Sequence, residues 1–366
     1  MIMMTNARTS TTLCGIKLSN PIVLAAGPYG RDAQTLERAI AAGFGAVTTK
    51  TIRLVPARNP FPNMARISRD TLINTEKWSD LPLKRWVTHE IPTIKRLKVP
   101  VIASIGFTQT EAKKIVPQIE QAGVDLIETV AYDAYQILPT AKAAKRASTV
   151  PVIVKISANW PDLERIAVKA AKLGVDAVSA IDSIGPASAI NVETGKPYLG
   201  DGGGEGWLSG SAIHPIAVRC VAKIAKKVKI PVIGIGGIFS GLDAAEMMMA
   251  GASCVELCTA PILHGLEIVG RIKNELLEFV ERRHYGSVQD MCGIALRNEG
   301  KRKRKNERKH PQINVELCTS CGVCAKLCPY QAMALKEGKI VVYPEQCLSC
   351  GLCASVCPHQ SIRLGD

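Results

Sequence analysis

The sequence of 366 residues is poor in aromatic residues, which make up 4% of the chain, and it contains no long hydrophobic run. No stretch of eighteen consecutive apolar residues occurs, so the sequence predicts no membrane-spanning helix. The first twelve residues lack an apolar segment after a basic start, which indicates no secretory signal, and we therefore expect a cytoplasmic protein. No G-x-G-x-x-G motif opens a helix after a strand, so no nicotinamide site is predicted.

Acidic residues are also scarce relative to basic ones, with 32 Asp and Glu against 46 Lys and Arg, and the formal net charge is +14. Much of the excess lies at 301–309, where seven cationic residues surround one acid. We interpret this run as part of a solvated linker over residues 299–312, with docking of an acidic redox partner as the alternative. No aromatic residue interleaves with these charges, so nucleic-acid binding is not expected.

Eight short apolar segments rich in β-branched residues recur at nearly regular spacing before residue 260. They are apolar on both faces, which is typical of buried parallel strands. Segments with helical periodicity separate them, and several of these end at a glycine, the usual left-handed helix stop. We predict strands at 21–26, 45–50, 100–105, 125–130, 151–156, 176–181, 231–236 and 254–259.

This alternation predicts an α/β fold, a (β/α)8 TIM barrel over residues 1–298, with a doubly wound sheet as the less even alternative. Active sites of such barrels lie at the carboxyl ends of the strands. Two long loops, 51–82 and 182–211, leave the barrel at that face, and we interpret them as lids or binding loops.

Thirteen cysteines divide into five scattered ones and eight in two tight runs after residue 317. Each run has the spacing C-x2-C-x2-C-x3-C-P, which is the bacterial two-cluster ferredoxin pattern, in which the fourth cysteine ligates the other cluster. Two zinc knuckles are the alternative, but zinc sites use separated cysteine pairs. We predict an α+β ferredoxin-like domain over 313–366 with two 4Fe–4S clusters, one held by Cys318, Cys321, Cys324 and Cys357 and the other by Cys347, Cys350, Cys353 and Cys328.

A barrel tethered to iron–sulfur clusters needs a centre that accepts single electrons and delivers pairs, and a flavin does this. Gly236 and Gly237 follow the seventh strand and Thr259 follows the eighth, where barrels bind phosphate through backbone amides. Ser209 and Gly210 close the loop after strand six and offer a further amide.

Two lysines end barrel strands at the same face. Lys155 ends strand five, where a buried ammonium needs an acceptor such as the N1–C2=O edge of a flavin ring, and Lys50 ends strand two. The alternative for either lysine is an ion pair with Glu128 or Glu256.

In combination, these motifs resemble the flavin domain of dihydropyrimidine dehydrogenases and dihydroorotate dehydrogenases. The matching stretches are 20–27, 49–51 and 59–60, while 73–83, 209–213 and 258–260 resemble the dihydropyrimidine branch, as does the C-terminal two-cluster module. The resemblance implies a flat pyrimidine-like substrate that stacks on the flavin ring and touches Asn74. It also implies FMN, bound by Ala26, Gly27, Lys50, Thr51, Lys155, Ser209, Gly210, Gly236, Gly237, Cys258 and Thr259.

The chain departs from that family after strands four and six. Val130 stands where the family has an asparagine, and the mobile loop with its catalytic cysteine or serine is missing. Tyr132, Asp133 and Tyr135 are the nearest candidates for a proton donor, with helix capping or packing as the alternative. Asp182 and Ser183 replace Asn-Thr or Asn-Ser; we expect both to bind substrate, and the carboxylate to favour a cationic or NH-rich one.

The resemblance implies an FMN- and iron–sulfur-dependent oxidoreductase that acts on the C–C or C=C bond of a dihydropyrimidine-like substrate of the uracil or thymine type. The clusters would relay electrons to a ferredoxin or to an NAD(P)- and FAD-binding flavoprotein subunit, and we expect an oligomer. The alternatives are a dihydroorotate dehydrogenase, a reductase of another unsaturated amide or acid, and an electron-transfer subunit without substrate chemistry.

Overall fold

The computed structural model describes residues 8–299 and 308–364, which belong to two compact units, Met1–Glu299 and Gly300–Asp366. Most of the predicted linker, 300–307, lies outside the described residues. The end of that predicted linker is not a linker, because a strand of the smaller unit begins at Pro311. In the described parts of both units, no helix combines the length and the apolar character needed to cross a bilayer.

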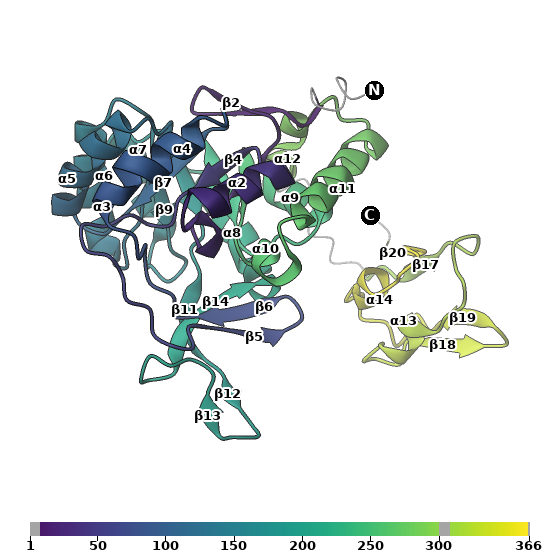
Figure 1. The fold of residues 1–366 in the computed structure, drawn as a ribbon. Helices are drawn as coiled ribbons and strands as arrows, with labels where there is room; N and C mark the ends of the chain where they lie inside the picture. Colours follow the sequence, from purple (N-terminus) through teal and green to yellow (C-terminus); the bar gives the residue numbers. More distant parts are fainter. Residues whose placement is uncertain (1–7, 300–307, 365–366) are drawn as a thin grey trace. The chain divides into compact units, whose positions relative to one another are not determined.

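The larger unit is a closed barrel of eight parallel strands surrounded by helices (Figure 1). The barrel closes where β16 (Cys254–Leu257) pairs with β3 (Ile22–Leu24). The strands are buried on both faces, which explains their continuous apolar runs. The predicted TIM barrel is confirmed. The other strands are β4 (Ala46–Thr48), β7 (Val101–Ile105), β8 (Leu126–Thr129), β9 (Val152–Ile156), β10 (Ala177–Ala180) and β15 (Val232–Ile235).

The helices alternate with these strands, and several stop at a glycine that adopts a left-handed conformation, such as Gly43 with φ 110° and Gly251 with φ 117°. The helices are α2 (Ala33–Ala42), α3 (Leu83–Arg85), a π-helical segment (Trp86–Glu90), α4 (Ile91–Lys95), α5 (Gln109–Gln121), α6 (Ala134–Ala147), α7 (Leu163–Lys172), α8 (His214–Ala225), α9 (Gly241–Met249), α10 (Thr259–His264), α11 (Ile268–Arg282) and α12 (Ile294–Asn298).

The two stretches predicted as long loops contain strands that pair with each other. In a four-stranded antiparallel sheet, β6 (Thr71–Asn74) lies between β5 (Met64–Ser68) and β14 (Glu205–Gly210), and β14 also pairs with β11 (Ile184–Ser188). The short hairpin of β12 (Ile190–Asn191) and β13 (Lys196–Pro197) extends from this sheet (Figure 1). The sheet fixes the two segments to one another beside the barrel.

The two ends of the barrel interior differ in polarity. The amino-terminal end is filled by an apolar cluster and packs against the hairpin of β1 (Thr11–Leu13) and β2 (Ile16–Leu18). Polar and charged side chains are instead buried farther along the strands, including Ser104, Glu128 and Lys155. The sequence therefore places chemistry-bearing groups at the carboxyl end, where barrel active sites lie.

The smaller unit combines short strands and helices, as the predicted α+β domain requires. Its core contains Cys324, Met333 and Ile362. Two antiparallel ribbons and two short helices make up its regular structure: β17 (Pro311–Ile313) with β20 (Ile362–Leu364), β18 (Met333–Lys336) with β19 (Lys339–Val342), α13 (Val323–Lys326) and α14 (Leu352–Ser355).

Candidate functional site

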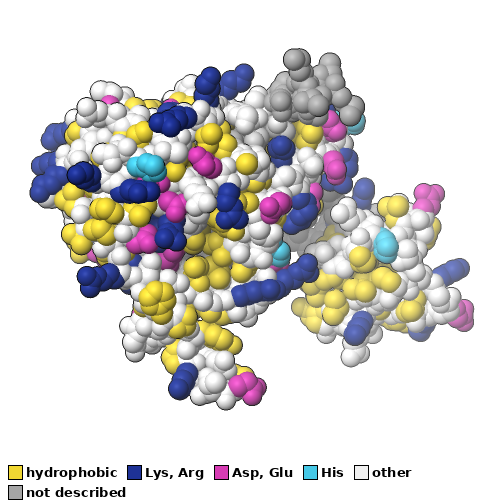
Figure 2. All heavy atoms as spheres, viewed as in Figure 1, with side chains coloured by type: hydrophobic (Ala, Val, Ile, Leu, Met, Phe, Trp, Pro, Cys, Tyr) yellow, Lys and Arg dark blue, Asp and Glu magenta, His cyan; other side chains and the backbone are white. Residues whose placement is uncertain are grey.

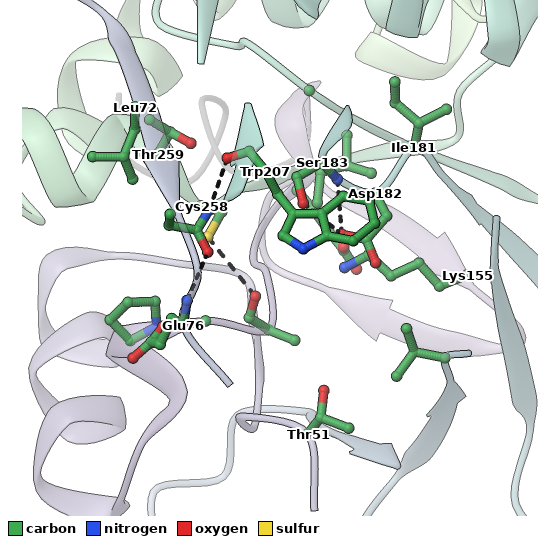
Figure 3. A pocket seen from close by; sticks show the side chains of 18 of the residues that line it. Thr51, Leu72, Glu76, Lys155, Ile181, Asp182, Ser183, Trp207, Cys258 and Thr259 are labelled. Atoms are coloured by element: carbon green, nitrogen blue, oxygen red, sulfur yellow. Dashed lines mark hydrogen bonds between the residues drawn. The ribbon is translucent and has the colours of Figure 1, made fainter. Parts of the chain in front are cut away.

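A cavity lies at the carboxyl ends of the barrel strands, and most of the predicted site residues line it (Figure 3). Asp133 and Ser209 are not among the lining residues. Asp133 precedes α6 at its N-cap and caps no helix amide, while Ser209 Oγ accepts a hydrogen bond from Thr259 Oγ1 at 2.8 Å. The predicted residues that do line the cavity are Ala26, Gly27, Lys50, Thr51, Asn74, Tyr132, Lys155, Asp182, Ser183, Gly210, Gly236, Gly237, Cys258 and Thr259.

Glycines form one wall of this cavity. A side chain at Gly237, with φ 68°, would place its Cβ 2.6 Å from the carbonyl oxygen of Gly210. The buried imidazole of His214 holds Gly236, the residue before Gly237, because its Nδ1 lies 2.8 Å from the Gly236 carbonyl oxygen. The amides of Gly236 and Gly237 donate no hydrogen bond to another described residue. Unpaired backbone donors in such a bend fit an anionic group such as a phosphate.

A second wall of the cavity is formed where the segment after β3 and the segment after β16 lie close together. A Cβ on Gly27 would lie only 2.7 Å from Cys258 Sγ, which itself lies 3.8 Å from the carbonyl oxygen of Ala26. Burial raises the pKa of Cys258 to about 12, so its thiol is neutral at physiological pH. Ala26, Gly27 and Cys258 have small side chains or none, so a flat ring could approach this wall closely.

Both lysines predicted for the cofactor are paired with carboxylates. Lys50 Nζ lies 2.7 Å from Glu76 Oε1, so its partner is neither of the two acids predicted for it. Lys155 Nζ lies 3.8 Å from Glu128 Oε1, which is the predicted alternative for that lysine. Burial would lower the pKa of Lys155, but Glu128 and Asp182 outweigh it and raise the pKa, so the ammonium is charged.

Five aromatic side chains line the cavity, although aromatic residues are rare in this chain, and four of them, Trp78, Phe107, Tyr132 and Trp207, form one group. The Tyr132 ring lies 4.4 Å from that of Phe107 and 6.4 Å from that of Trp207, measured between centroids. Trp78 makes an edge contact with Phe107 at 5.7 Å. Sequence reasoning found only Tyr132, because the four come from separate segments and carry no common motif.

Arg53 contacts two rings of this aromatic group. Its guanidinium lies 4.4 Å from the Trp78 ring centroid and 4.5 Å from that of Phe107. Two hydrogen bonds, of 2.8 and 3.0 Å, join it to the Glu111 carboxylate. Burial would raise the pKa of Glu111, but the bonds from Arg53 and the Phe107 amide lower it, so the pair is ionised at neutral pH.

The predicted substrate residues lie at the junction of the barrel and the sheet. Asn74 Nδ2 donates to the carbonyl oxygen of Trp207 at 3.3 Å. Asp182 Oδ1 accepts from the Ser183 amide at 2.8 Å. Burial first, and then the charge of Asp182, raise the pKa of Tyr132, so its hydroxyl is protonated at neutral pH. A carboxylate, an amide and a phenol thus share one side of the cavity.

The eight clustered cysteines surround two separate cavities in the smaller unit. Within the described residues, no three His, Cys, Asp or Glu side chains come together closely enough to hold a single metal ion. Backbone amides approach two of the sulfurs, Ala332 N at 3.3 Å from Cys328 Sγ and Ser349 N at 3.4 Å from Cys347 Sγ. One cavity is lined by Cys318, Cys321, Cys324 and Cys357, and the other by Cys328, Cys347, Cys350 and Cys353. These are the two crossed sets that the spacing predicts.

Known proteins resemble this chain over both units. Catalytic subunits of dihydroorotate dehydrogenase B (NAD(+)) from Pyrococcus horikoshii and Caldicellulosiruptor saccharolyticus are 34% and 32% identical to it, over 78% and 77% of this chain and 97% of each relative. The NAD-dependent dihydropyrimidine dehydrogenase subunit PreA of Escherichia coli K12 is 28% identical over 90% of this chain and 88% of its own length.

The fold has a counterpart among solved structures. The dihydroorotate dehydrogenase of Eimeria tenella in complex with ferulenol matches with a TM-score of 0.67 and 22% identity, over 79% of this chain and 88% of that one. The dihydroorotate dehydrogenase family model matches residues 8–131 and 127–280, and a 4Fe-4S dicluster domain model matches 310–358. The chain therefore belongs to the dihydroorotate dehydrogenase family of oxidoreductases and carries an iron–sulfur domain at its C-terminal end.

Proposed function

We propose that this chain is an FMN- and iron–sulfur-dependent oxidoreductase acting on the C–C or C=C bond of an uncharged, dihydropyrimidine-like ring of the uracil or thymine type. The observation that carries this choice is the charge of the cavity. Four acidic side chains line it, Glu76, Glu128, Asp182 and Glu256, against three lysines, Lys50, Lys77 and Lys155, so the lysines are not in excess when one of the acids keeps its proton. A substrate that bears its own carboxylate, such as dihydroorotate, would meet no net positive charge there.

The cavity fits FMN by the properties of its walls. The unpaired amides of Gly236 and Gly237 would hold the phosphate, and Ala26, Gly27 and Cys258 would face the ring. Lys155 would supply a cation to the N1–C2=O edge of the ring. When bound, FMN supplies hydride transfer and single-electron exchange. The chain's own residues orient the ring, shield it from water and hold protons near it.

The substrate would lie between the ring and the aromatic side chains. Trp207 and Phe107 offer flat apolar contacts, and Asp182 offers an acceptor for a ring N–H group. The protonated Tyr132 hydroxyl, held near Asp182, would give or take the proton at the carbon beside the carbonyl. Asp133 and Tyr135 do not line the cavity, so Tyr132 is the best candidate of the three predicted donors.

Two crossed sets of four thiols support two 4Fe–4S clusters that pass electrons singly between the flavin and an external protein. A ferredoxin, or a nicotinamide-binding flavoprotein subunit, would be that protein, in the cytoplasm and within an oligomer. Unpaired cations support an acidic partner: Figure 2 shows Lys and Arg side chains gathered over α5 and α6. A groove between α5, α6 and α7 is lined by Lys113, Lys142, Arg146, Lys169 and Lys172, and by no acid.

Two observations favour other functions. Several relatives of 32–34% identity are named dihydroorotate dehydrogenases, which supports that activity. The missing catalytic loop supports a subunit that only transfers electrons. Anaerobic photoreduction followed by addition of uracil, thymine, orotate or fumarate separates these readings. Reoxidation of the flavin by uracil or thymine supports our proposal. If none of the four compounds reoxidises the flavin but a ferredoxin does so rapidly, the result supports a subunit that only transfers electrons.

A further inference from the structure

The polar layer beneath the cavity holds more acid than base. Glu128 on β8 and Glu256 on β16 are 0% and 1% exposed, and Lys155 on β9 is 5% exposed. Asp182, after β10, adds a third carboxylate nearby, since its charge acts on Glu128, Glu256 and Lys155 alike. One ammonium thus faces three carboxylates, two of which, those of Glu128 and Glu256, are almost wholly buried.

The carboxylates lack the donors that buried anions need. Neither oxygen of Glu128, nor Oε1 of Glu256, has a hydrogen-bond partner among the described residues. The remaining oxygen of Glu256 receives a long bond of 3.4 Å from Ser179 Oγ. An ionised, unsolvated carboxylate costs several kcal/mol, and protonation is the usual relief.

We propose that one of Glu128 and Glu256 keeps its proton at neutral pH, so that the two glutamates serve as a buried proton store at the redox cavity. Two carboxylates opposite one lysine retain a proton for the same reason as a catalytic carboxylate dyad, because both cannot ionise at low cost. Burial, and then the neighbouring Glu128, raise the pKa of Glu256 to about 8, and burial raises that of Glu128.

The groups that face this pair come from most strands of the barrel. Lys155 is the cation among them, Asp182 adds negative charge, and the Cys258 thiol is neutral. The neutral hydroxyls nearby are those of Ser104 and Ser179. No other charge is available to replace the proton among these neighbours.

The role of this stored proton in the reaction rests on the proposed function. Bound FMN would gain negative charge near Lys155 on two-electron reduction, and the protonated carboxyl of the pair would donate its proton there. The carboxylate left behind would pair with Lys155, and a proton released on reoxidation would return to it. One proton would leave the pair and one would return in each cycle.

Infrared spectroscopy of the full, cofactor-loaded protein in H2O and D2O tests the store without any substrate. We expect a carboxylic-acid C=O band at pH 7 that shifts in D2O and fades as the pH rises through 8. Glu256→Gln and Glu128→Gln should each abolish it, because the one remaining glutamate then pairs with Lys155 as an anion. Glutamine has the shape of the neutral acid, so both variants should fold and keep their flavin.

Glu278→Gln, at an exposed position of α11, is the matched control and should leave the band unchanged. Absence of the band in the unaltered protein at pH 7, or its persistence in either glutamine variant, would overturn the proposal. Because no turnover is measured, a failure of the dihydropyrimidine activity would leave this result standing, and the reverse holds too.

Discussion

Glu76 Oε1 lies 2.7 Å from the ammonium nitrogen of Lys50, and both side chains are largely buried, at 14% and 5% exposure. Lys50 follows the barrel strand β4, whereas Glu76 follows β6 in the sheet beside the barrel. The pair therefore links the barrel to the sheet. It also neutralises the Lys50 ammonium, which would otherwise be free to bind the carboxylate of a ligand.

Removal of the Glu76 charge should open the cavity to anionic rings. Glu76→Gln frees Lys50, and we expect orotate to bind about tenfold or more tightly, as for a charge-assisted bond of about 1.5–3 kcal/mol. Titration of the flavin absorbance with orotate measures this. Glu205→Gln, at an exposed position of β14, should show no gain. Equal orotate affinity in Glu76→Gln and the unaltered protein would show that this ion pair does not control substrate charge.

The glycine wall should be intolerant of a single methyl group. In Gly237→Ala the new Cβ would lie 2.6 Å from the Gly210 carbonyl oxygen, and the positive φ adds strain of about 1–2 kcal/mol. We expect the protein to be purified with little flavin. Gly270→Ala on α11 has open space around it and should keep full flavin content. A full complement of flavin in Gly237→Ala would refute the placement of the phosphate.

Stability should fall as the pH rises toward 8, because of Glu256. Its folded-state pKa of about 8 lies above the usual value, so between the two values the folded protein holds more protons than the unfolded chain. Thermal unfolding should show Glu256→Gln more stable than the parent at pH 8.5 and similar to it near pH 5. The slope difference approaches about 1.4 kcal/mol per pH unit. Parallel pH curves for the two proteins would argue against a raised pKa.

The Tyr132 hydroxyl should matter to turnover but not to cofactor binding. Tyr132→Phe keeps the ring contacts with Phe107 and Trp207 and removes only the proton donor. We expect kcat to fall by about 10²–10⁴-fold, the usual range for loss of general acid catalysis, with flavin content unchanged. Steady-state kinetics under anaerobic conditions measure this. Tyr135→Phe, at a site 74% exposed, is the control, and a similar kcat in all three proteins would exclude this role.

The barrel was predictable because its signals are local. Each strand is a short run buried on both faces, and glycines such as Gly43 stop the helices wherever they occur. The two thiol sets rest on an equally local signal, the spacing of each cysteine run, together with the ferredoxin pattern that assigns the fourth cysteine of each run to the other set. Each predicted set lines a cavity of its own.

Long-range pairings were not predictable in this way. The sheet joins β6 to β14, with Asn74 opposite Trp207, more than 100 residues apart and without clear alternation. Gly206 permits that pairing, because a Cβ there would lie 2.6 Å from the Asn74 carbonyl oxygen. The Lys50–Glu76 pair and the aromatic contacts of Phe107 depend on this sheet or on loops, so no spacing in the sequence indicates them.

The central claim is that the cavity reduces or oxidises an uncharged pyrimidine-like ring rather than a ring acid. The most direct measurement is the rate of flavin reoxidation when the photoreduced protein is mixed anaerobically with uracil, thymine or orotate in separate stopped-flow experiments. We predict rapid reoxidation by uracil or thymine and little by orotate. In Glu76→Gln, reoxidation by orotate should become faster. Rapid reoxidation by orotate, with none by uracil or thymine, would contradict the account.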